Sequence, residues 1–224
     1  MKMRWGAALM AAAMLFVAAP QVDAEEAIPE DIYQWVQSTS RQNYYFNKQQ
    51  MYFAVNDQGN VNVDVLLVPT LKTYDQVQKQ DVISKRRWKM LPMSGYSDLV
   101  GTAEYLSFNL KDQTVQVARH EDLDSDWGVL STATPTLVTK VTDLSDRDVD
   151  GIFYRAILKY ANNHIDEIAA RTVEVKKAKL TDSAKAELAA LKDPTAAKAA
   201  RTVKKSTGQA RPTRAAADTD SQAK

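Results

Sequence analysis

The sequence predicts an α+β fold in which a C-terminal amphipathic helix packs on a small antiparallel sheet. Two runs rich in β-forming residues, Glu104–Leu110 and Thr114–Leu123, are separated only by the polar turn Lys111–Gln113. An earlier run, 61–68, places Val or Leu at every second position, which is the period of a strand. Apolar residues then recur with helical spacing over Val149–Ala161. Strands joined by short turns and followed by a covering helix are typical of this fold class.

The N-terminus has the three-part layout of a secretory signal peptide. Two cations precede an apolar run over Gly6–Ala19, Pro20 ends the run, and Val22–Ala24 supplies small residues for cleavage. The run is about 14 residues long, shorter than the roughly 20 that a membrane-spanning helix needs, and no later run approaches that length. We therefore expect a signal peptide over residues 1–24 and an exported mature chain that begins at Glu25 and has no transmembrane helix.

The chain contains no cysteine. An exported protein of this sequence would therefore fold without a disulfide, and a lipid-modified cysteine could not anchor it at the cleavage site. Its stability must come from the apolar core, which a body of about 150 residues can form without a structural metal.

The charge distribution divides the mature chain into two parts. Residues 25–173 carry 15 Lys and Arg against 21 Asp and Glu, a net charge of −6, whereas 174–224 carries 12 against 6, a net charge of +6. The second part is rich in Ala and Lys and has no aromatic residue. We expect one folded domain over 25–173 and a mostly disordered cationic tail over 174–224, with a short helix at Asp182–Leu191 as the exception. The tail is either a solvated extension or an electrostatic contact with anionic polymer or lipid, and nucleic acid is not an expected partner.

The first half of the domain is predicted to contain a hairpin. Pro29–Gln37 has apolar residues at helical spacing but also the length of a strand, so both remain open. Asn43–Phe46 and Met51–Val55 are dense in Tyr, Phe and Val and lead into a turn-forming stretch at 56–60. The strand that follows is expected to end at Pro69, because proline lacks the N–H that a ladder requires.

Residues 70–100 give weaker signals. Part of Tyr74–Arg87 is predicted to be helical, and Lys85–Lys89 then gathers four cations around Trp88. These cations could pair with an anionic ligand. The favoured interpretation is a solvated face with a buried indole and with the aliphatic stems of Arg and Lys packed beneath.

The second half of the domain is predicted to close with a third strand and a helix. Val129–Leu130 follows a glycine-containing turn at 124–128 and is expected to fold back on the preceding strand. Ser145 is the expected helix cap, with acidic residues in the first turn. The centre of the apolar stripe is Ile157, which should be buried against the sheet.

Two acidic stretches resemble cation sites. Asp146–Gly151 fits the first half of a calcium-binding loop, but the twelfth position, which should carry a bidentate acid, is Ile157. A helix cap is therefore favoured there. A second group lies near the strand turn and has Trp127 where a calcium loop needs glycine, so a solvated turn is favoured over a weak cation site. Its members are Glu121, Asp122, Asp124 and Asp126. No metal or cofactor site is predicted.

No recognised catalytic motif is present in the sequence. The two histidines are His120, on a predicted strand, and His164, near the end of the predicted helix. There is no nucleophile elbow, no zinc-binding H-E-x-x-H and no phosphate-binding glycine loop. Carboxylates such as Glu104 and Asp126 could meet in space, but spacing alone does not show it. We expect a non-catalytic protein and assign no catalytic or binding residues.

The order of several short motifs resembles the surface-adhesin protein E-like domain of bacterial envelope proteins. The motifs are Trp35-Val36, Tyr44-Tyr45-Phe46, Glu104-Tyr105, then Asp124 and Gly128 followed by Val129-Leu130 and the final helix, over roughly 32–161. The resemblance implies a small antiparallel sheet with a terminal helix and a role at the cell surface. Asn47 stands where the family usually has aspartate, and the family's paired cysteines are missing, so no binding residue is carried over.

These observations favour an exported, non-catalytic protein of the cell envelope or surface, located in the periplasm, at the cell surface or outside the cell. It would bind an envelope or host macromolecule in an adhesin-like manner. The alternative is a periplasmic module that binds a small ligand or a cation, for which the acidic turn is the only indication.

Overall fold

The structure is a computed structural model that describes residues 28–192. Within this range it confirms the α+β class, because an open antiparallel sheet of eight strands is accompanied by four α-helices, including a C-terminal one. The predicted signal peptide, residues 1–24, and the part of the predicted tail beyond Lys192 lie outside the described residues.

The sheet is formed by one long meander with two short additions. Its strands are β1 (Tyr33–Ser38), β2 (Gln42–Asn47), β3 (Tyr52–Val55), β4 (Val61–Tyr74), β5 (Leu99–Asn109), β6 (Thr114–Asp124), β7 (Val129–Ala133) and β8 (Val138–Lys140). The main order is β1-β2-β4-β5-β6-β7, with β3 added to β4 and β8 added to β6. All these pairs are antiparallel, and the pairing of β5, β6 and β7 agrees with the sequence prediction.

Pro69 does not end its strand, which corrects the sequence prediction. β4 continues through Pro69 to Tyr74, and Pro69 pairs with Tyr105 of β5. On its other edge β4 pairs with β3 as far as Leu67 and with β2 from Thr70 onward. Pro69 therefore lies where that edge passes from one partner to the other, a position at which a missing N–H donor is tolerated.

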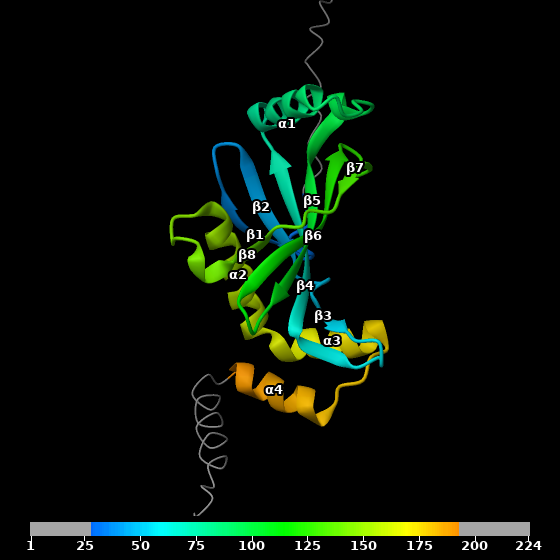
Figure 1. Ribbon diagram of the computed structural model, residues 1–224, viewed down its shortest axis with the longest axis vertical. Helices are drawn as coiled ribbons and strands as arrows, with labels where there is room; N and C mark the ends of the chain where they lie inside the picture. Colours follow the sequence, from blue (N-terminus) through cyan, green and yellow to red (C-terminus); the bar gives the residue numbers. More distant parts are fainter. Residues whose placement is uncertain (1–27, 193–224) are drawn as a thin grey trace, which may run out of the picture.

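The helices pack at the two ends and on one face of the sheet. They are α1 (Gln76–Trp88), α2 (Val149–Asn163), α3 (Ile165–Lys176) and α4 (Asp182–Lys192), with short 3-10 turns η1 (Tyr96–Asp98) and η2 (Val141–Asp143). Figure 1 shows α1 at one end of the elongated body and α3 with α4 at the other, with the sheet between them. The helix predicted within 74–87 and the helix predicted over 149–161 are thus α1 and α2.

The cap of α2 differs from the predicted one. Asp148 is the N-cap, and its carboxylate accepts a hydrogen bond of 2.8 Å from the Gly151 backbone N–H. Ser145 lies one turn earlier, where its carbonyl accepts a hydrogen bond from the N–H of Asp148. The acidic start of Asp146–Gly151 therefore serves a helix cap, as favoured from the sequence.

The core lies between the sheet and the apolar stripe of α2. Phe153 and Ile157 are fully buried, as predicted for Ile157, and they pack against residues of β2, β4 and β5. Phe153 contacts Tyr44 edge to face, with ring centroids 5.3 Å apart. The stripe is displaced from the predicted one, because Val149 and Ile152 are exposed whereas Tyr154 is buried.

The folded part continues beyond the boundary expected after Val173. That boundary falls inside α3, which ends at Lys176, and α4 adds Ala184 and Leu188 to the same core cluster. Between the two helices Lys179 exchanges backbone hydrogen bonds with Gly59 and Val61 at the start of β4. The first part of the predicted tail is therefore ordered, and the helix expected at Asp182–Leu191 is α4.

The helices of residues 28–192 include none that combines the length and apolarity needed to cross a bilayer.

Candidate functional site

The face of the sheet that carries the core becomes charged toward α1. In the register of β4 and β5, the apolar pairs Leu66 with Phe108 and Val68 with Leu106 are followed by Thr70 with Glu104 and by Lys72 with Thr102. On β6, His120 lies opposite Glu104, and Asp122 lies opposite Thr102. Alternate residues of a strand share one face, so these side chains form two adjacent rows across three strands, Thr70–Glu104–His120 and Lys72–Thr102–Asp122. We call Lys72, Arg86, Tyr96, Glu104, His120 and Asp122 the charged cluster.

His120 bridges the two carboxylates of the cluster. Its Nε2 lies 3.2 Å from Asp122 Oδ1, and its Nδ1 lies 3.3 Å from Glu104 Oε1. These hydrogen bonds, first from Asp122 and then from Glu104, favour the imidazolium and raise the pKa of His120 to about 9 although partial burial opposes the shift. The ring is therefore protonated at neutral pH and donates from both nitrogens.

Lys72 forms the other ion pair of Glu104. Its Nζ lies 2.8 Å from Glu104 Oε2, and both side chains are almost completely buried. Burial alone would raise the pKa of Glu104, but the hydrogen bond from His120 and the charge of Lys72 lower it to about 2. Burial would likewise lower the pKa of Lys72, yet the charges of Glu104 and Asp150 raise it above its ordinary value. Both groups thus stay ionised across the physiological range.

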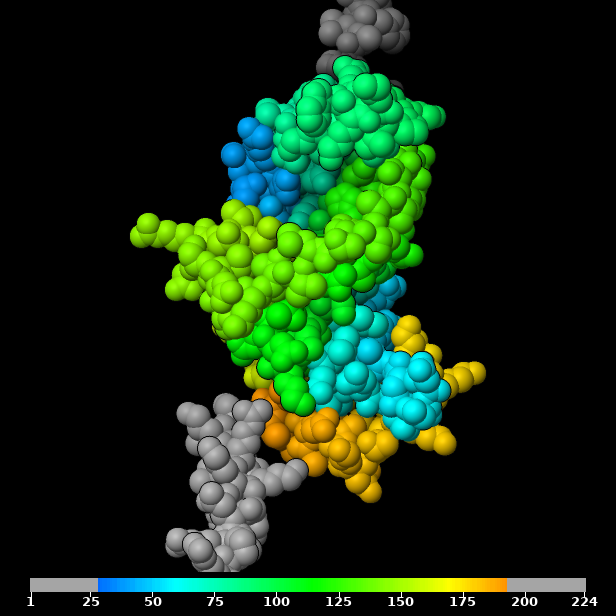
Figure 2. All heavy atoms as spheres, viewed as in Figure 1, coloured from blue at the N-terminus to red at the C-terminus, as the bar shows by residue number. Residues whose placement is uncertain are grey.

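Arg86 joins α1 to the cluster. Its guanidinium lies 3.9 Å from the centroid of the Tyr96 ring, and its Nη1 lies 3.6 Å from Asp122 Oδ2. The Tyr96 hydroxyl donates a hydrogen bond of 2.6 Å to the same Asp122 oxygen. Nε of Arg86 is buried and has no hydrogen-bond partner. Figure 2 shows the surface hollowed below α1, between the β1–β2 hairpin and the segment that leads into α2.

The charged cluster has the chemistry of a rigid binding or support element. A protonated His120 with both nitrogens engaged has no lone pair to act as a general base or to ligate a metal. Each carboxylate is matched by a cation, which is the condition under which buried charges persist. Among residues 28–192 there is no group of three or more His, Asp or Glu side chains arranged to hold a metal ion.

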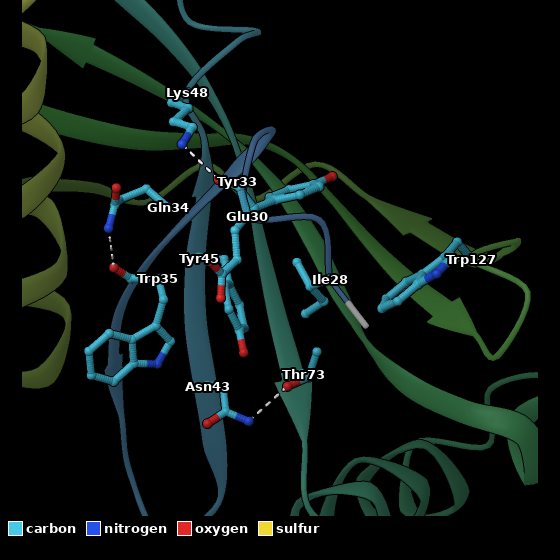
Figure 3. A pocket seen from close by; sticks show the side chains of 10 residues that line it. All are labelled: Ile28, Glu30, Tyr33, Gln34, Trp35, Asn43, Tyr45, Lys48, Thr73 and Trp127. Carbon is cyan, nitrogen blue, oxygen red and sulfur yellow. Dashed lines mark hydrogen bonds between the residues drawn. The ribbon is translucent and has the colours of Figure 1, made fainter. Parts of the chain in front are cut away.

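The opposite face of the sheet carries an open groove. One cavity of about 670 Å³ lies over β1 and β2, and a second of about 440 Å³ adjoins it over β4, β5 and β6. Ile28, Tyr33 and Trp127 line both cavities, so the two form one trough. We call it the aromatic groove. Figure 3 shows the first cavity and its lining residues, Ile28, Glu30, Tyr33, Gln34, Trp35, Asn43, Tyr45, Lys48, Thr73 and Trp127.

A hydrogen-bonded chain fixes the polar floor of the groove. The indole N–H of Trp35 donates to Ser38 Oγ, the Ser38 hydroxyl donates to Asn43 Oδ1, and Asn43 Nδ2 donates to Thr73 Oγ1 at 3.0 Å. Trp35 pairs with Tyr45 across β1 and β2. Because 53% of Trp35 is exposed, its ring is available to a ligand while its N–H is already oriented.

The second cavity continues the same pattern of aromatic rings and fixed polar groups. The Arg119 guanidinium stacks on the Tyr105 ring at 3.9 Å, and its Nε lies 3.2 Å from Glu121 Oε1. Trp127 is held in the turn before β7 with a φ of 61°, a left-handed conformation that is uncommon for a tryptophan. Its backbone N–H donates to the Asp124 carbonyl at 3.0 Å, and Trp127 lines both cavities at their junction.

The structure brings only some of the residues singled out from the sequence together. Glu104 meets His120 rather than Asp126, whose backbone N–H is bound by Asp124 in the turn. His164 caps the end of α2 and stacks on Tyr160. The expected burial of Trp88 is wrong, because 83% of this residue is exposed.

Several site residues were not singled out from the sequence. Lys72 and Arg86 were not recognised as partners of Glu104 and His120, although a charged residue at an inward position of a predicted strand is a usable signal. Trp35 lies in a stretch that the sequence leaves open between helix and strand, and Tyr45 lies in a β-forming stretch. A period of two does not reveal which face of a sheet stays uncovered.

Comparison of the chain with protein-family models, characterised proteins and solved structures gives no match.

Proposed function

We propose that this protein is an exported, non-catalytic binding protein of the cell envelope or surface, and that it holds a glycan chain in the aromatic groove. The observation that carries the proposal is the groove itself, a trough lined by Tyr33, Trp35, Tyr45 and Trp127 on a sheet face that no helix of the described residues covers. The predicted signal peptide supports the location, and the resemblance to a surface-adhesin domain supports a role in attachment.

The chemistry of the lining favours a neutral glycan. Flat aromatic rings suit the apolar faces of sugar rings, and amides such as Gln34 and Asn43 can exchange hydrogen bonds with hydroxyl groups. Glu30 and Lys48 contribute the charges of the first cavity, and the Lys48 ammonium donates to the Glu30 carbonyl at 2.7 Å. An extended peptide is less suitable, because strand addition needs a sheet edge and the groove lies on a sheet face.

Binding of soluble glycan oligomers tests the proposal. We expect the mature protein to bind neutral or N-acetylated oligosaccharides, and we expect Trp35→Ala and Tyr45→Ala each to weaken binding by at least about tenfold. The matched control is Trp88→Ala, which removes an exposed tryptophan of α1 that lines neither cavity and should leave binding unchanged. Titration calorimetry measures the dissociation constant of the glycan for the wild type, the two groove variants and the control. Binding that survives both groove substitutions, or the absence of any glycan ligand, contradicts the proposal.

A small anionic ligand in the hollow beside the charged cluster is a second candidate. One observation favours it, the buried Nε of Arg86 that lacks a hydrogen-bond partner. An oxygen acceptor at this atom would complete the guanidinium, which binds carboxylates and phosphates well. A thermal-shift screen with small carboxylates and inorganic phosphate tests it. Stabilisation that Arg86→Lys abolishes would support this candidate, whereas no stabilisation by any of these anions would contradict it.

A further inference from the structure

The C-terminal end of α1 exposes large apolar side chains among cations. Trp88 is 83% exposed, Met90 is 92% exposed and Leu91 is 42% exposed. Lys85, Arg87 and Lys89 are also exposed around them. We call these six residues the α1 tip. Single exposed apolar residues are common, but three within four positions at the end of the molecule form an apolar patch, which is typical of an interaction site.

The cations of the tip are available for a partner of opposite charge. Lys85 pairs with Asp81 at 2.9 Å, one turn earlier on the exposed side of the helix. Such an exposed pair is weak, so Lys85 can still interact with a partner. No ion pair is formed by Arg87 or Lys89 within the described part of the chain. Cations in a last turn also complement the helix dipole, but that accounts only for the charges and not for the exposed indole.

The tip is a fixed structure rather than a frayed helix end. The backbone N–H groups of Lys89, Met90 and Leu91 donate to the carbonyls of Lys85, Arg87 and Arg86 at 3.0–3.1 Å. Met90 has a φ of 52°, so the chain reverses there in a left-handed conformation. Underneath, Arg86 points inward and donates to the Pro92 carbonyl at 3.0 Å. The apolar side chains are thus held outward while Arg86 anchors the turn to the charged cluster.

The shape of the tip favours a flat partner. α1 forms one end of the long axis of the body, and Figure 2 shows it as a convex cap. A convex patch offers no pocket for a small ligand or a partner side chain. Tryptophan is preferred at the level of lipid headgroups, where the ring is half in hydrocarbon and its N–H is in water. Lysine and arginine beside it are attracted to an anionic lipid surface, with a gain of about fivefold in binding for each cation.

We propose that the α1 tip docks on an anionic phospholipid bilayer. Trp88, Met90 and Leu91 enter the headgroup layer, and Lys85, Arg87 and Lys89 lie against the phosphates. The protein then stands on the membrane with its long axis away from it, and the aromatic groove stays open to solvent. This docking is independent of glycan binding, so either can fail without the other.

Fluorescence of Trp88 tests the docking directly. The mature chain has three tryptophans, because Trp5 lies in the predicted signal peptide, so Trp35→Phe with Trp127→Phe leaves Trp88 alone. Vesicles of phosphatidylglycerol and phosphatidylcholine in equal parts should shift its emission to shorter wavelength, and pure phosphatidylcholine should not. Salt should reverse the shift, because it screens the cations. Should the double substitution fail to fold, the wild-type emission shift and its loss in Trp88→Phe give the same information.

The cationic tail provides the main competing explanation, and the design separates the two. The tail has no aromatic residue, so its adsorption would sediment the protein with vesicles and leave the Trp88 emission unchanged. Lys89→Glu should raise the lipid concentration needed for half of the emission shift by about tenfold or more. Its control, Lys111→Glu, makes the same charge change at the β5–β6 turn and should have little effect. Vesicle binding without a Trp88 shift, or equal effects of the two substitutions, overturns the proposal.

Discussion

One face of the sheet contains two regions built on the same three strands. Under α2 the rows of β4, β5 and β6 consist of Leu, Val and Phe side chains, whereas toward α1 the next rows consist of the charged cluster. The change occurs within one step of the pleat, between Val68 and Thr70. The backbone geometry continues across it, so the difference between the two regions lies in the side chains alone. Burial of the apolar side chains stabilises the fold. Burial of the charged side chains costs desolvation free energy, which only their mutual pairing offsets.

The difference indicates separate roles for the two regions. The apolar region involves α2, α3 and α4 and holds the fold together. The charged region contacts α1 through Arg86 and gives that helix a defined position over the sheet. Ion pairs of this kind are directional, whereas apolar contacts are not. Four predictions distinguish the regions by how each responds to substitution and pH.

The largest effect is expected in the apolar region. Ile157 is fully buried at the centre of the α2 stripe, so Ile157→Glu should prevent folding because a carboxylate there has no partner. Ile157→Ala should fold and lose about 2–5 kcal/mol of unfolding free energy. Circular dichroism with urea titration measures both. A folded Ile157→Glu protein that calcium stabilises would contradict the assignment of Asp146–Gly151 to a helix cap.

A single deletion in the charged cluster should be almost as costly as one in the core. Glu104→Ala leaves the almost completely buried Lys72 and the partly buried His120 without their shared carboxylate and should cost about 3–5 kcal/mol. Adding Lys72→Met should cost less than the sum of the two single effects, because the second substitution removes an unpaired charge. The control Asp64→Ala, which breaks an exposed pair with Lys111, should cost no more than about 1 kcal/mol.

His120 should make the free energy of unfolding depend on pH in the alkaline range, and this effect belongs to the charged region only. The pKa of His120 is raised to about 9 in the fold, so the folded state binds its proton more tightly than the unfolded chain does. This stabilisation is fully present below pH about 6.5 and is lost as the pH rises through about 9. It amounts to about 3 kcal/mol. Urea titrations from pH 6 to 10 measure it, and His120→Gln should remove this component while a flat profile in the wild type would refute it.

The smallest effect should be local to α1. Arg86→Ala removes the contacts with Asp122, Ser131 and Pro92, and we expect a loss of about 1–3 kcal/mol confined to the opening of this helix. Hydrogen exchange should show weaker protection of the α1 amides with unchanged protection of α2. Equal loss of protection in both helices would mean that the two regions form one cooperative unit.

The local elements follow from patterns within short stretches of the sequence. The runs around the β5–β6 turn, the strand from Val61 and the apolar stripe of α2 each repeat with a period set by their own backbone geometry, so neighbours in sequence were sufficient to predict them. The acidic cap of α2 was also readable, although the cap residue is Asp148 rather than Ser145, because capping groups lie within one turn.

The contacts between these elements depend on how the whole chain folds. Pro69 is tolerated because β4 changes partners beside it, and α4 is ordered because Leu188 reaches the core, two facts that depend on segments far along the chain. Trp88 points outward because Arg86 occupies the inward side of α1. The charged cluster spans 50 positions, from Lys72 to Asp122, and the first cavity of the aromatic groove spans 99, from Ile28 to Trp127. No local period encodes which strands lie side by side or which face is left uncovered.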